Sequence, residues 1–296
     1  MAFSKGDDRV LGRLSNSSHL RRVVLPILAR INPGDITIRH HLTGDPVHLH
    51  SFRHKGYWFH GFTRERAVLL FIARLVPSDA VVLHIGAHIG YTTLYLSTLA
   101  PNGVVHAFEP GANNLSYLKA NVASHHNIIV SDLAVSDREG EGTLGVEDLT
   151  GRNNSMLSDM EIYHRNAELA FVRTQTTQQP VRLTTVDRYC ERLTIRPSFI
   201  KIDTEGFEFE VLSGARRTLE SDFPIVMVET TRRIPEVVDV LHGLGYTLVT
   251  AQLQRMDRLP AWNENVVAVH EEQHPWAVQF LSSVESDEGR LAQAEA

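Results

Sequence analysis

Short apolar runs alternate with segments of helical periodicity along most of this chain. Such alternation indicates βαβ units and a mostly parallel sheet that helices cover. The pattern predicts helices at 64–76, 113–125, 207–220 and 235–245. It predicts strands at 80–85, 104–108, 128–135, 198–203 and 224–230, followed by two closing strands, YTLVTA and NVVAVH.

Upstream of these units, DITIRHH and VHLHSF surround a Gly-Asp-Pro turn, and this pattern predicts a β-hairpin between about residues 35 and 60.

We therefore divide the chain into three parts. Residues 1–63 form an N-terminal extension with a short helix at 23–29 and the hairpin, which acts as a cap. Residues 64–275 form the main domain, and residues 276–296 form an acidic tail. Between Ser136 and Pro180 the rhythm breaks into a polar insertion, and a long irregular segment of this kind is usually functional.

Composition and charge narrow the class of protein. The 296 residues carry a net charge of −6, so no overall field would draw the chain to nucleic acid. The single cysteine excludes an internal disulfide and cysteine-rich zinc sites. The N-terminus lacks the apolar region of a signal peptide, and VVLPILA is far shorter than the ~20 residues that span a bilayer. These features predict a cytoplasmic protein without stable membrane insertion.

The stretch VVLHIGAHIGYTT, residues 81–93, joins a predicted strand to a helix through two glycines. Gly86 permits a tight turn, and Gly90 permits a ligand or a strand to approach the helix start closely. The nicotinamide fingerprint G-x-G-x-x-G is not matched, because His88 occupies the position of the second glycine and would crowd a pyrophosphate. A nucleoside ligand without phosphates fits better, although a purely structural turn is the alternative.

Two acids at the ends of the next strands favour the nucleoside interpretation. Glu109 follows Gly90 by nineteen residues, close to the ~20 expected for an acid that binds ribose hydroxyls. Asp132, after the third strand, is a candidate partner for an adenine amine. For each acid the alternative is a solvated residue at a strand end.

The stretch SFIKIDTEGFEFEVL, residues 198–212, brings Asp203, Glu205 and Glu208 to the end of a buried strand. Strand alternation places Lys201 on the face of Asp203, and a lysine in an apolar strand must be paired or reach a cavity. Clustered carboxylates near a cationic ligand tune one another's pKa and serve as a base. The alternative, acids that suit a helix dipole, explains Glu208 but not Lys201.

Five segments in this order resemble the FkbM family of S-adenosylmethionine-dependent methyltransferases: VVLHIGAHIGYTT, VHAFEPGANN, SDLAVSD, VRLTTVD and FIKIDTEGFEFEVLSGA. The resemblance covers roughly residues 65–230, and K-I-D-x-E-G-x-E is its most specific part. It implies an α/β class I methyltransferase fold, a doubly wound, Rossmann-like seven-stranded sheet whose last strand is antiparallel. It also implies methyl transfer from S-adenosylmethionine, usually to a hydroxyl of a sugar or of a polyketide-like secondary metabolite.

The resemblance also implies roles for individual residues. The turn from Gly86 to Gly90 should surround the methionine end of the cofactor, and Glu109 should hold its ribose. His84 departs from the family, which normally has an aspartate there; a neutral imidazole can still accept a hydrogen bond but loses the charge attraction. The candidate cofactor-binding residues are His84, Gly86, Ala87, His88, Gly90, Glu109, Asn114 and Asp132. The candidate catalytic residues are Lys201, Asp203 and Glu205, and the candidate substrate-binding residues are Glu208, Glu229, Tyr57 and His60.

Sixteen histidines raise the question of a metal. His48 and His50 alternate on one strand, but no acid or cysteine follows at ligand spacing, so we expect no metal in the site. We expect the hairpin to lie across the open end of the sheet and to shape the acceptor pocket. Its aromatic side chains are Tyr57, Trp58 and Phe59, which either form a lid over that pocket or only pack against the protein.

The sequence thus predicts an S-adenosylmethionine-dependent O-methyltransferase of secondary metabolism, acting on a sugar-containing or polyketide-type small molecule. A homodimer is left open. The alternatives are a catalytically silent nucleoside-binding protein of the same fold and an NAD-dependent oxidoreductase, which His88 and the missing third glycine disfavour.

Overall fold

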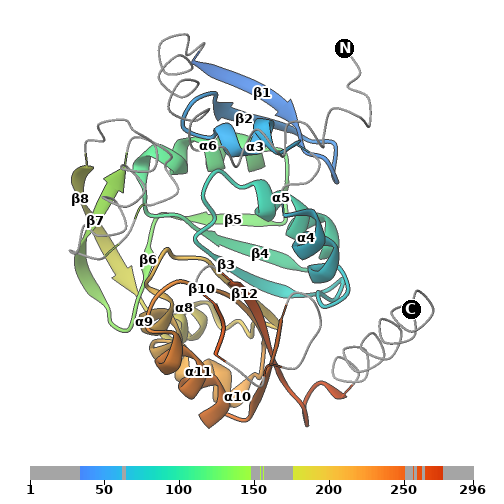
Figure 1. Cartoon of the computed structure of the whole chain (residues 1–296), viewed down its shortest axis with the longest axis vertical. Helices are drawn as coiled ribbons and strands as arrows, with labels where there is room; N and C mark the ends of the chain where they lie inside the picture. Colours follow the sequence, from blue (N-terminus) through green and yellow to red (C-terminus); the bar gives the residue numbers. More distant parts are fainter. Residues whose placement is uncertain are drawn as a thin grey trace, which may run out of the picture.

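A computed structural model describes residues 34–61, 65–147, 154, 156, 176–250, 256, 259–261 and 264–275. A seven-stranded sheet forms the centre of the molecule, in the order β11-β12-β10-β9-β3-β4-β5 (Figure 1). Its strands are β3 (Val81–Ile85), β4 (Val104–Phe108), β5 (Ile128–Ser131), β9 (Phe199–Ile202), β10 (Ile225–Thr230), β11 (Tyr246–Thr250) and β12 (Glu264–His270).

The pairing within this sheet confirms the fold that the family resemblance implies. The strands from β10 to β5 pair in parallel, whereas β12, the last strand in sequence, runs antiparallel between β10 and β11. The chain builds the sheet outward from β3 in one direction through β4 and β5, and in the other direction through β9 and β10. The strand order therefore reverses between β3 and β9, and ligands bind parallel sheets at the carboxyl ends of the strands beside such a reversal.

Helices cover both faces of the sheet, and each face has its own apolar core. On one face α4 (Arg66–Ile72), α5 (Tyr91–Leu99) and α6 (Ala112–Val122) pack on the side chains of Val82, Val105 and Phe199. On the other face lie α8 (Val186–Leu193), α9 (Glu208–Ser213), α10 (Arg216–Ser221) and α11 (Ile234–Gly243). Burial on both faces explains why the strand segments are so apolar.

The predicted hairpin is present as β1 (Asp35–Arg39) and β2 (Pro46–His50), followed by the short helix α3 (Lys55–Phe59). It packs beside α6 (Figure 1). The Asn121 side chain joins the two, because its Oδ1 accepts from the backbone N–H of His48 at 2.7 Å and its Nδ2 donates to the backbone oxygen of Ile89 at 2.8 Å. The same side chain thus connects the hairpin to the glycine turn after β3.

The structure corrects the prediction for residues 128–135 and for the insertion. The single predicted strand is two strands in different sheets, β5 and the short β6 (Ala134–Val135). The insertion contributes β7 (Gly140–Glu147) and β8 (Thr176–Thr184), which form a second, three-stranded sheet with β6. The apolar pattern does not predict β7 and β8, because these strands contain glycines and many polar residues. Only one face of this sheet is apolar, and it consists of Leu144, Val146, Val181 and Leu183.

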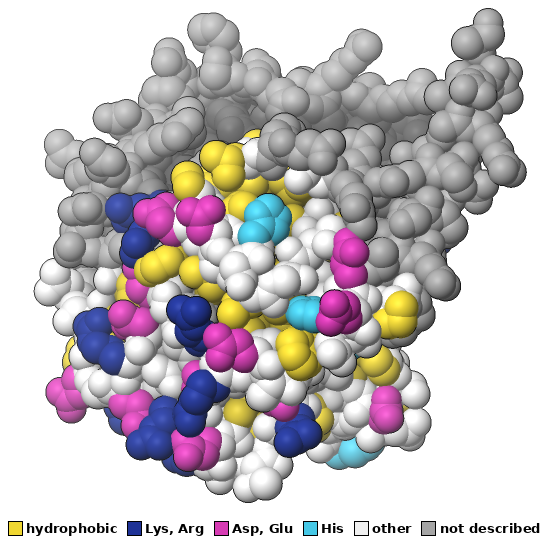
Figure 2. Space-filling view, turned by 90° about the horizontal axis from the view of Figure 1, so that it is seen from below, with side chains coloured by type: hydrophobic (Ala, Val, Ile, Leu, Met, Phe, Trp, Pro, Cys, Tyr) yellow, Lys and Arg dark blue, Asp and Glu magenta, His cyan; other side chains and the backbone are white. Residues whose placement is uncertain are grey.

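The helices on the second face are corrected as well. The single helix predicted over 207–220 is two, α9 and α10, and α8 was not predicted. Gly214 lies between the two helices, and only glycine fits there because a Cβ would lie 2.1 Å from the backbone oxygen of Ser136. Acidic and basic side chains are interspersed over the face seen in Figure 2. Ion pairs join helices of this layer, such as Arg217 of α10 with Glu191 of α8, and also residues within one helix, such as Arg216 with Glu220.

Several predictions lie outside the described residues: the helix at 23–29, the tail at 276–296 and most of the segment GRNNSMLSDM. Among the helices that the structure describes, none is long and apolar enough to cross a membrane.

Candidate active site

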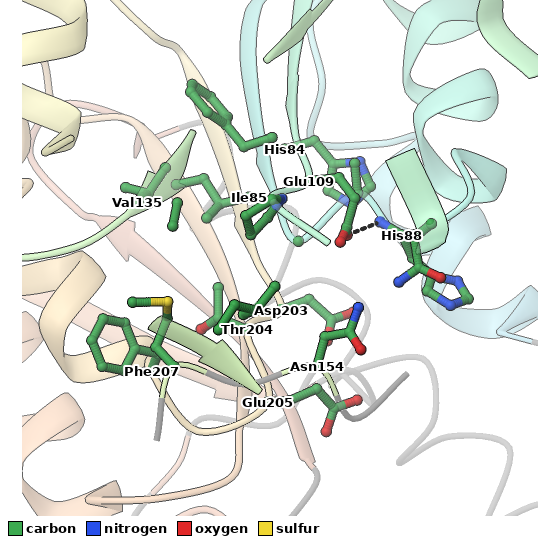
Figure 3. Close-up of a pocket in the computed structure, with 18 of the residues that line it drawn as sticks. His84, Ile85, His88, Glu109, Val135, Asn154, Asp203, Thr204, Glu205 and Phe207 are labelled. Atoms are coloured by element: carbon green, nitrogen blue, oxygen red, sulfur yellow. Dashed lines mark hydrogen bonds between the residues drawn. The ribbon is translucent and has the colours of Figure 1, made fainter. Parts of the chain in front are cut away.

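A cleft opens at the carboxyl ends of β3, β4 and β9, where the strand order reverses. It encloses about 880 Å³ of space that is continuous with solvent. Figure 3 shows Glu109 and His88 on one side of this cleft and Asp203, Thr204 and Glu205 on the other. Of the candidate residues, His84, Gly86, Ala87, His88, Glu109, Asn114, Asp203, Glu205 and Tyr57 line it.

The glycine turn after β3 is shaped by two different close contacts. The backbone N–H groups of Gly86 and Ala87 both donate to the backbone oxygen of Phe108, at 3.0 and 2.8 Å. Gly86 has a φ of +87°, and a Cβ there would lie 1.8 Å from the backbone oxygen of Asp203. Gly86 thus lets the β3 turn and the β9 turn touch. Gly90 also has positive φ, but its close neighbour is Leu118 of α6, which assigns it to helix packing.

His88 occupies the middle of the turn in a left-handed conformation, with a φ of 52°. Its backbone N–H donates to Glu109 Oε2 at 2.8 Å, and its Nδ1 is hydrogen-bonded to the Tyr57 hydroxyl at 2.9 Å. Tyr57 belongs to α3, so the N-terminal extension holds the turn directly. The other two predicted aromatic side chains do not line the cleft: Trp58 packs on the apolar core, and Phe59 is exposed. The candidate substrate-binding residue His60 is exposed as well and does not line the cleft.

Glu109 ends β4 with only 5% of its surface exposed. Besides the bond from His88, its Oε1 accepts from the backbone N–H of Gly111 at 2.9 Å, and the Asn114 side chain is also hydrogen-bonded to it. Burial raises the pKa of Glu109 to about 7, although these hydrogen bonds oppose the shift. Since a carboxylate offers about four acceptor positions, one remains for a ligand hydroxyl.

His84 is buried at the end of β3, and its Nδ1 is hydrogen-bonded to the Thr93 hydroxyl at 2.8 Å. Burial, with the neighbouring Lys201 ammonium, lowers the pKa of His84 to about 3. The imidazole is therefore neutral at physiological pH. The position where the family normally carries a charge is uncharged here.

The turn after β9 carries the acidic cluster. Lys201 is buried in β9, and its Nζ donates to Asp203 Oδ2 at 2.8 Å, so the pairing predicted from strand alternation is present. Burial by itself lowers the pKa of Lys201, but the neighbouring carboxyl groups, Asp203 first, outweigh burial and raise it. Glu205 follows in a left-handed conformation with a φ of 52°. A left-handed backbone conformation is uncommon for a residue other than glycine, and His88, which also lines the cleft, shares it.

Besides Gly90, His60 and Lys201, three more candidate residues lie outside the lining of the cleft. Glu208 is fully buried and holds the turn together, since it accepts from the Gly206 N–H at 2.8 Å and from the Thr231 hydroxyl at 2.7 Å. Asp132 is exposed and forms an ion pair with Arg182 at 2.9 Å. Glu229, at the end of β10, lies behind Asp203 and is hydrogen-bonded to it. None of these three lines the cleft.

The cleft also contains residues that the sequence did not single out. Glu65 lines it from the start of α4, where its φ of 51° is left-handed. Asn154 and Met156 line it from the insertion, and Asn154 Nδ2 donates to Asn113 Oδ1 at 2.8 Å. The only available signals were an acid at the start of the helix predicted at 64–76 and the irregular character of the insertion.

Comparison with known proteins identifies the family. The model of the methyltransferase FkbM domain matches residues 84–248, which is more than half of the chain. The chain belongs to the FkbM methyltransferase family. The cofactor of this family is S-adenosylmethionine. The match covers the glycine turn, Glu109 and the acidic turn, so the family resemblance stated from the sequence is confirmed.

The individual proteins that this FkbM family member resembles match it over only part of their length or at low sequence identity. Methyltransferase 1 of Beauveria bassiana is 25% identical over 154 residues, 47% of this chain and 59% of that protein. The AMB antimetabolite synthetase AmbE of Pseudomonas aeruginosa is 41% identical over 70 residues, 23% of this chain and 3% of that protein. The chain thus spans less than two thirds of either relative. The crystal structure of methyltransferase FkbM from Methylobacillus flagellatus KT is 18% identical with a TM-score of 0.45, over 68% of this chain and 47% of that one.

The residues of the cleft fit S-adenosylmethionine. This cofactor carries a sulfonium and an ammonium, and the described side chains offer them three carboxylates, on Glu65, Asp203 and Glu205. The acceptor position left on Glu109 suits a ribose hydroxyl. The cationic and nucleoside ends of the cofactor therefore both find matching groups.

Proposed function

We propose that this FkbM family member is a cytoplasmic S-adenosylmethionine-dependent O-methyltransferase, acting on a hydroxyl of a sugar-containing or polyketide-type small molecule. The observation that supports this best is the contact of the two turns. The Gly86 turn and the Asp203 turn touch at the carboxyl ends of adjacent strands, so the cofactor side and the acidic side face one cleft.

The proposed class of acceptor is supported by one relative rather than by Tyr57. Tyr57 lines the cleft, and its largely buried ring stacks on the imidazole of His88 with ring centroids 5.7 Å apart. The antimetabolite synthetase AmbE, part of which this chain resembles, is a protein of secondary metabolism by its name, and this supports an acceptor of that class.

The chemistry asks the protein for alignment and for a base. When bound, the cofactor supplies a methyl group on a sulfonium, and the electron pair of the broken carbon–sulfur bond stays on sulfur as the acceptor oxygen bonds to carbon. Holding the acceptor in line is the larger contribution, since positioned reactants gain ~7–11 kcal/mol. A sugar or alkyl hydroxyl is a poor nucleophile at neutral pH, and a positioned base typically adds ~10²–10⁴-fold in rate.

Asp203 and Glu205 are the proposed source of that base. One of the two carboxylates accepts the proton of the acceptor hydroxyl, and the other orients the hydroxyl. Lys201, 2.8 Å from Asp203, keeps the pair charged.

The proposal is tested with the purified protein, S-adenosylmethionine labelled in its methyl group and extracts that contain candidate acceptors. We expect labelled small molecules to appear, and mass spectrometry to place the methyl group on oxygen. A label found only on nitrogen or carbon would contradict O-methylation. Absence of any turnover, with the cofactor bound, would instead favour the silent nucleoside-binding protein.

A further inference from the structure

Glu229 lies in a buried group of charged side chains behind the cleft. It is the last residue but one of β10 and follows Val228, which pairs with Ile202 of β9, so it stands beside Asp203. Its side chain is 8% exposed and is hydrogen-bonded to the Asp203 carboxyl group. Asp203 also accepts from the Lys201 ammonium at 2.8 Å. Asp203 therefore has both an ammonium and a carboxyl group as partners.

A hydrogen bond between two carboxyl groups requires that one of them carries a proton. Two bare carboxylates in contact would repel one another in a poorly solvated place, and one of them takes up a proton instead. The charge count agrees with this, because one ammonium balances one carboxylate. Lys201, Asp203 and Glu229 are together neutral if one of the acids is protonated.

We propose that Glu229 is a protonated positioning residue, whose carboxyl O–H donates to Asp203 and, together with Lys201, fixes Asp203 as an anion. In the proposed methyl transfer, on which this second step rests, Asp203 then orients the acceptor hydroxyl. Two donors already stabilise its negative charge, which makes it a weak base. The proton of the acceptor hydroxyl passes to the Glu205 carboxylate, which becomes a neutral carboxyl group.

The surroundings of Glu229 favour its neutral form. From β9 and its turn it faces Lys201, Asp203 and Glu205, and its partner in the antiparallel pair with β12 is the uncharged Asn265. His84 of β3 and Glu65 at the start of α4 act on the same group through Lys201, and His84 is neutral. Burial first, and then the charge of Asp203, raise the pKa of Glu229 to about 10, whereas Lys201 opposes the shift.

This arrangement has a testable effect on stability. The unfolded chain releases the Glu229 proton near the ordinary pKa of a glutamate, about 4.3, whereas the folded protein keeps it up to about pH 10. The stability that the proton contributes is present at low pH and is lost progressively as the pH rises between these values. Glutamine keeps an N–H donor for Asp203 and has no proton to lose.

We therefore expect Glu229→Gln to gain stability relative to the wild type as the pH rises. The Tm of the variant minus the Tm of the wild type should be larger at pH 9 than at pH 5, by about 4 °C or more. The matched control is Glu236→Gln on the surface of α11, where a backbone hydrogen bond first, and then the ion pair with Arg233, lower the pKa of the carboxyl group. Its difference from the wild type should stay constant over this range. Thermal unfolding of the three proteins at several pH values measures both.

An activity measurement completes the test. With any acceptor found for the enzyme, Glu229→Gln should keep kcat within about threefold, whereas Glu229→Ala, which removes the donor, should lose about tenfold without a change in the KM for the cofactor. The proposal would be overturned if the Tm difference between Glu229→Gln and the wild type stays constant or falls as the pH rises. It would also be overturned if Glu229→Gln loses as much kcat as Glu229→Ala. If the protein transfers no methyl group, the proposed function fails, but the stability measurement still decides whether Glu229 is protonated.

Discussion

Replacing Glu205 by glutamine should lower kcat by about 10²-fold or more while the affinity for the cofactor stays nearly intact. Glutamine preserves the shape of the side chain but cannot take up the proton of the acceptor hydroxyl. The pH profile of kcat should also lose its acidic limb, because that limb reports the protonation of the base. Steady-state kinetics and titration calorimetry on the same preparations measure the two effects separately.

The matched control for this variant is Glu210→Gln, five positions further along the same segment. Glu210 makes an ion pair with Arg233 at 3.2 Å and does not line the cleft, so kcat should be unchanged. Asp203→Asn serves as the comparison within the pair. A full loss in Asp203→Asn together with near-normal rates in Glu205→Gln would exchange the two roles. Near-normal rates in both variants would place the base elsewhere.

The second large effect is expected at Glu109. Glu109→Ala should weaken binding of S-adenosylmethionine by tenfold or more, since hydrogen bonds to charged groups contribute about 1.5–3 kcal/mol each. The maximal rate at saturating cofactor should change much less, because contacts to ribose exist equally in the ground state and the transition state. The variant also loses the acceptors of the His88 and Gly111 N–H groups, so part of the loss comes from a less ordered turn.

Asp132→Ala is the control that separates these contributions from a general effect of negative charge. Asp132 also follows a strand of the same sheet, but it is exposed and paired with Arg182. We expect its dissociation constant for the cofactor to stay within about twofold, in line with the small contribution of exposed ion pairs. An unchanged dissociation constant in Glu109→Ala would mean that Glu109 only holds the turn. A large change in Asp132→Ala would restore the adenine contact that the sequence suggested.

The parts of the fold that the sequence predicts well are those where one local rule dominates. The central strands are apolar because both faces are buried, and their positions agree with the prediction to within a residue or two. The contact of Lys201 with Asp203 follows from strand alternation alone. The small sheet of β6, β7 and β8 was missed because its residues are largely polar and pair over a long separation in sequence, Gly140 with Leu183 for example.

The candidate site shows the same division. Glu109, Asp203 and Glu205 reach the cleft because they follow parallel strands, whose ends meet at one edge of the sheet. Glu208 carries the same charge within the same motif, yet its oxygens are taken up by Gly206 and Thr231, which no spacing reveals. Glu65 comes to the cleft through a left-handed backbone conformation that propensity does not predict for a glutamate.

The most direct test of the central claim, that the cleft binds S-adenosylmethionine, is titration calorimetry of the purified chain with S-adenosylhomocysteine, the demethylated product, and with NADH. The turn has His88 where a pyrophosphate-binding turn has glycine, and its neighbour Glu109 has an acceptor position left for a ribose hydroxyl. We expect saturable binding of S-adenosylhomocysteine and no heat of binding with NADH. Binding of NADH without binding of S-adenosylhomocysteine would contradict the account.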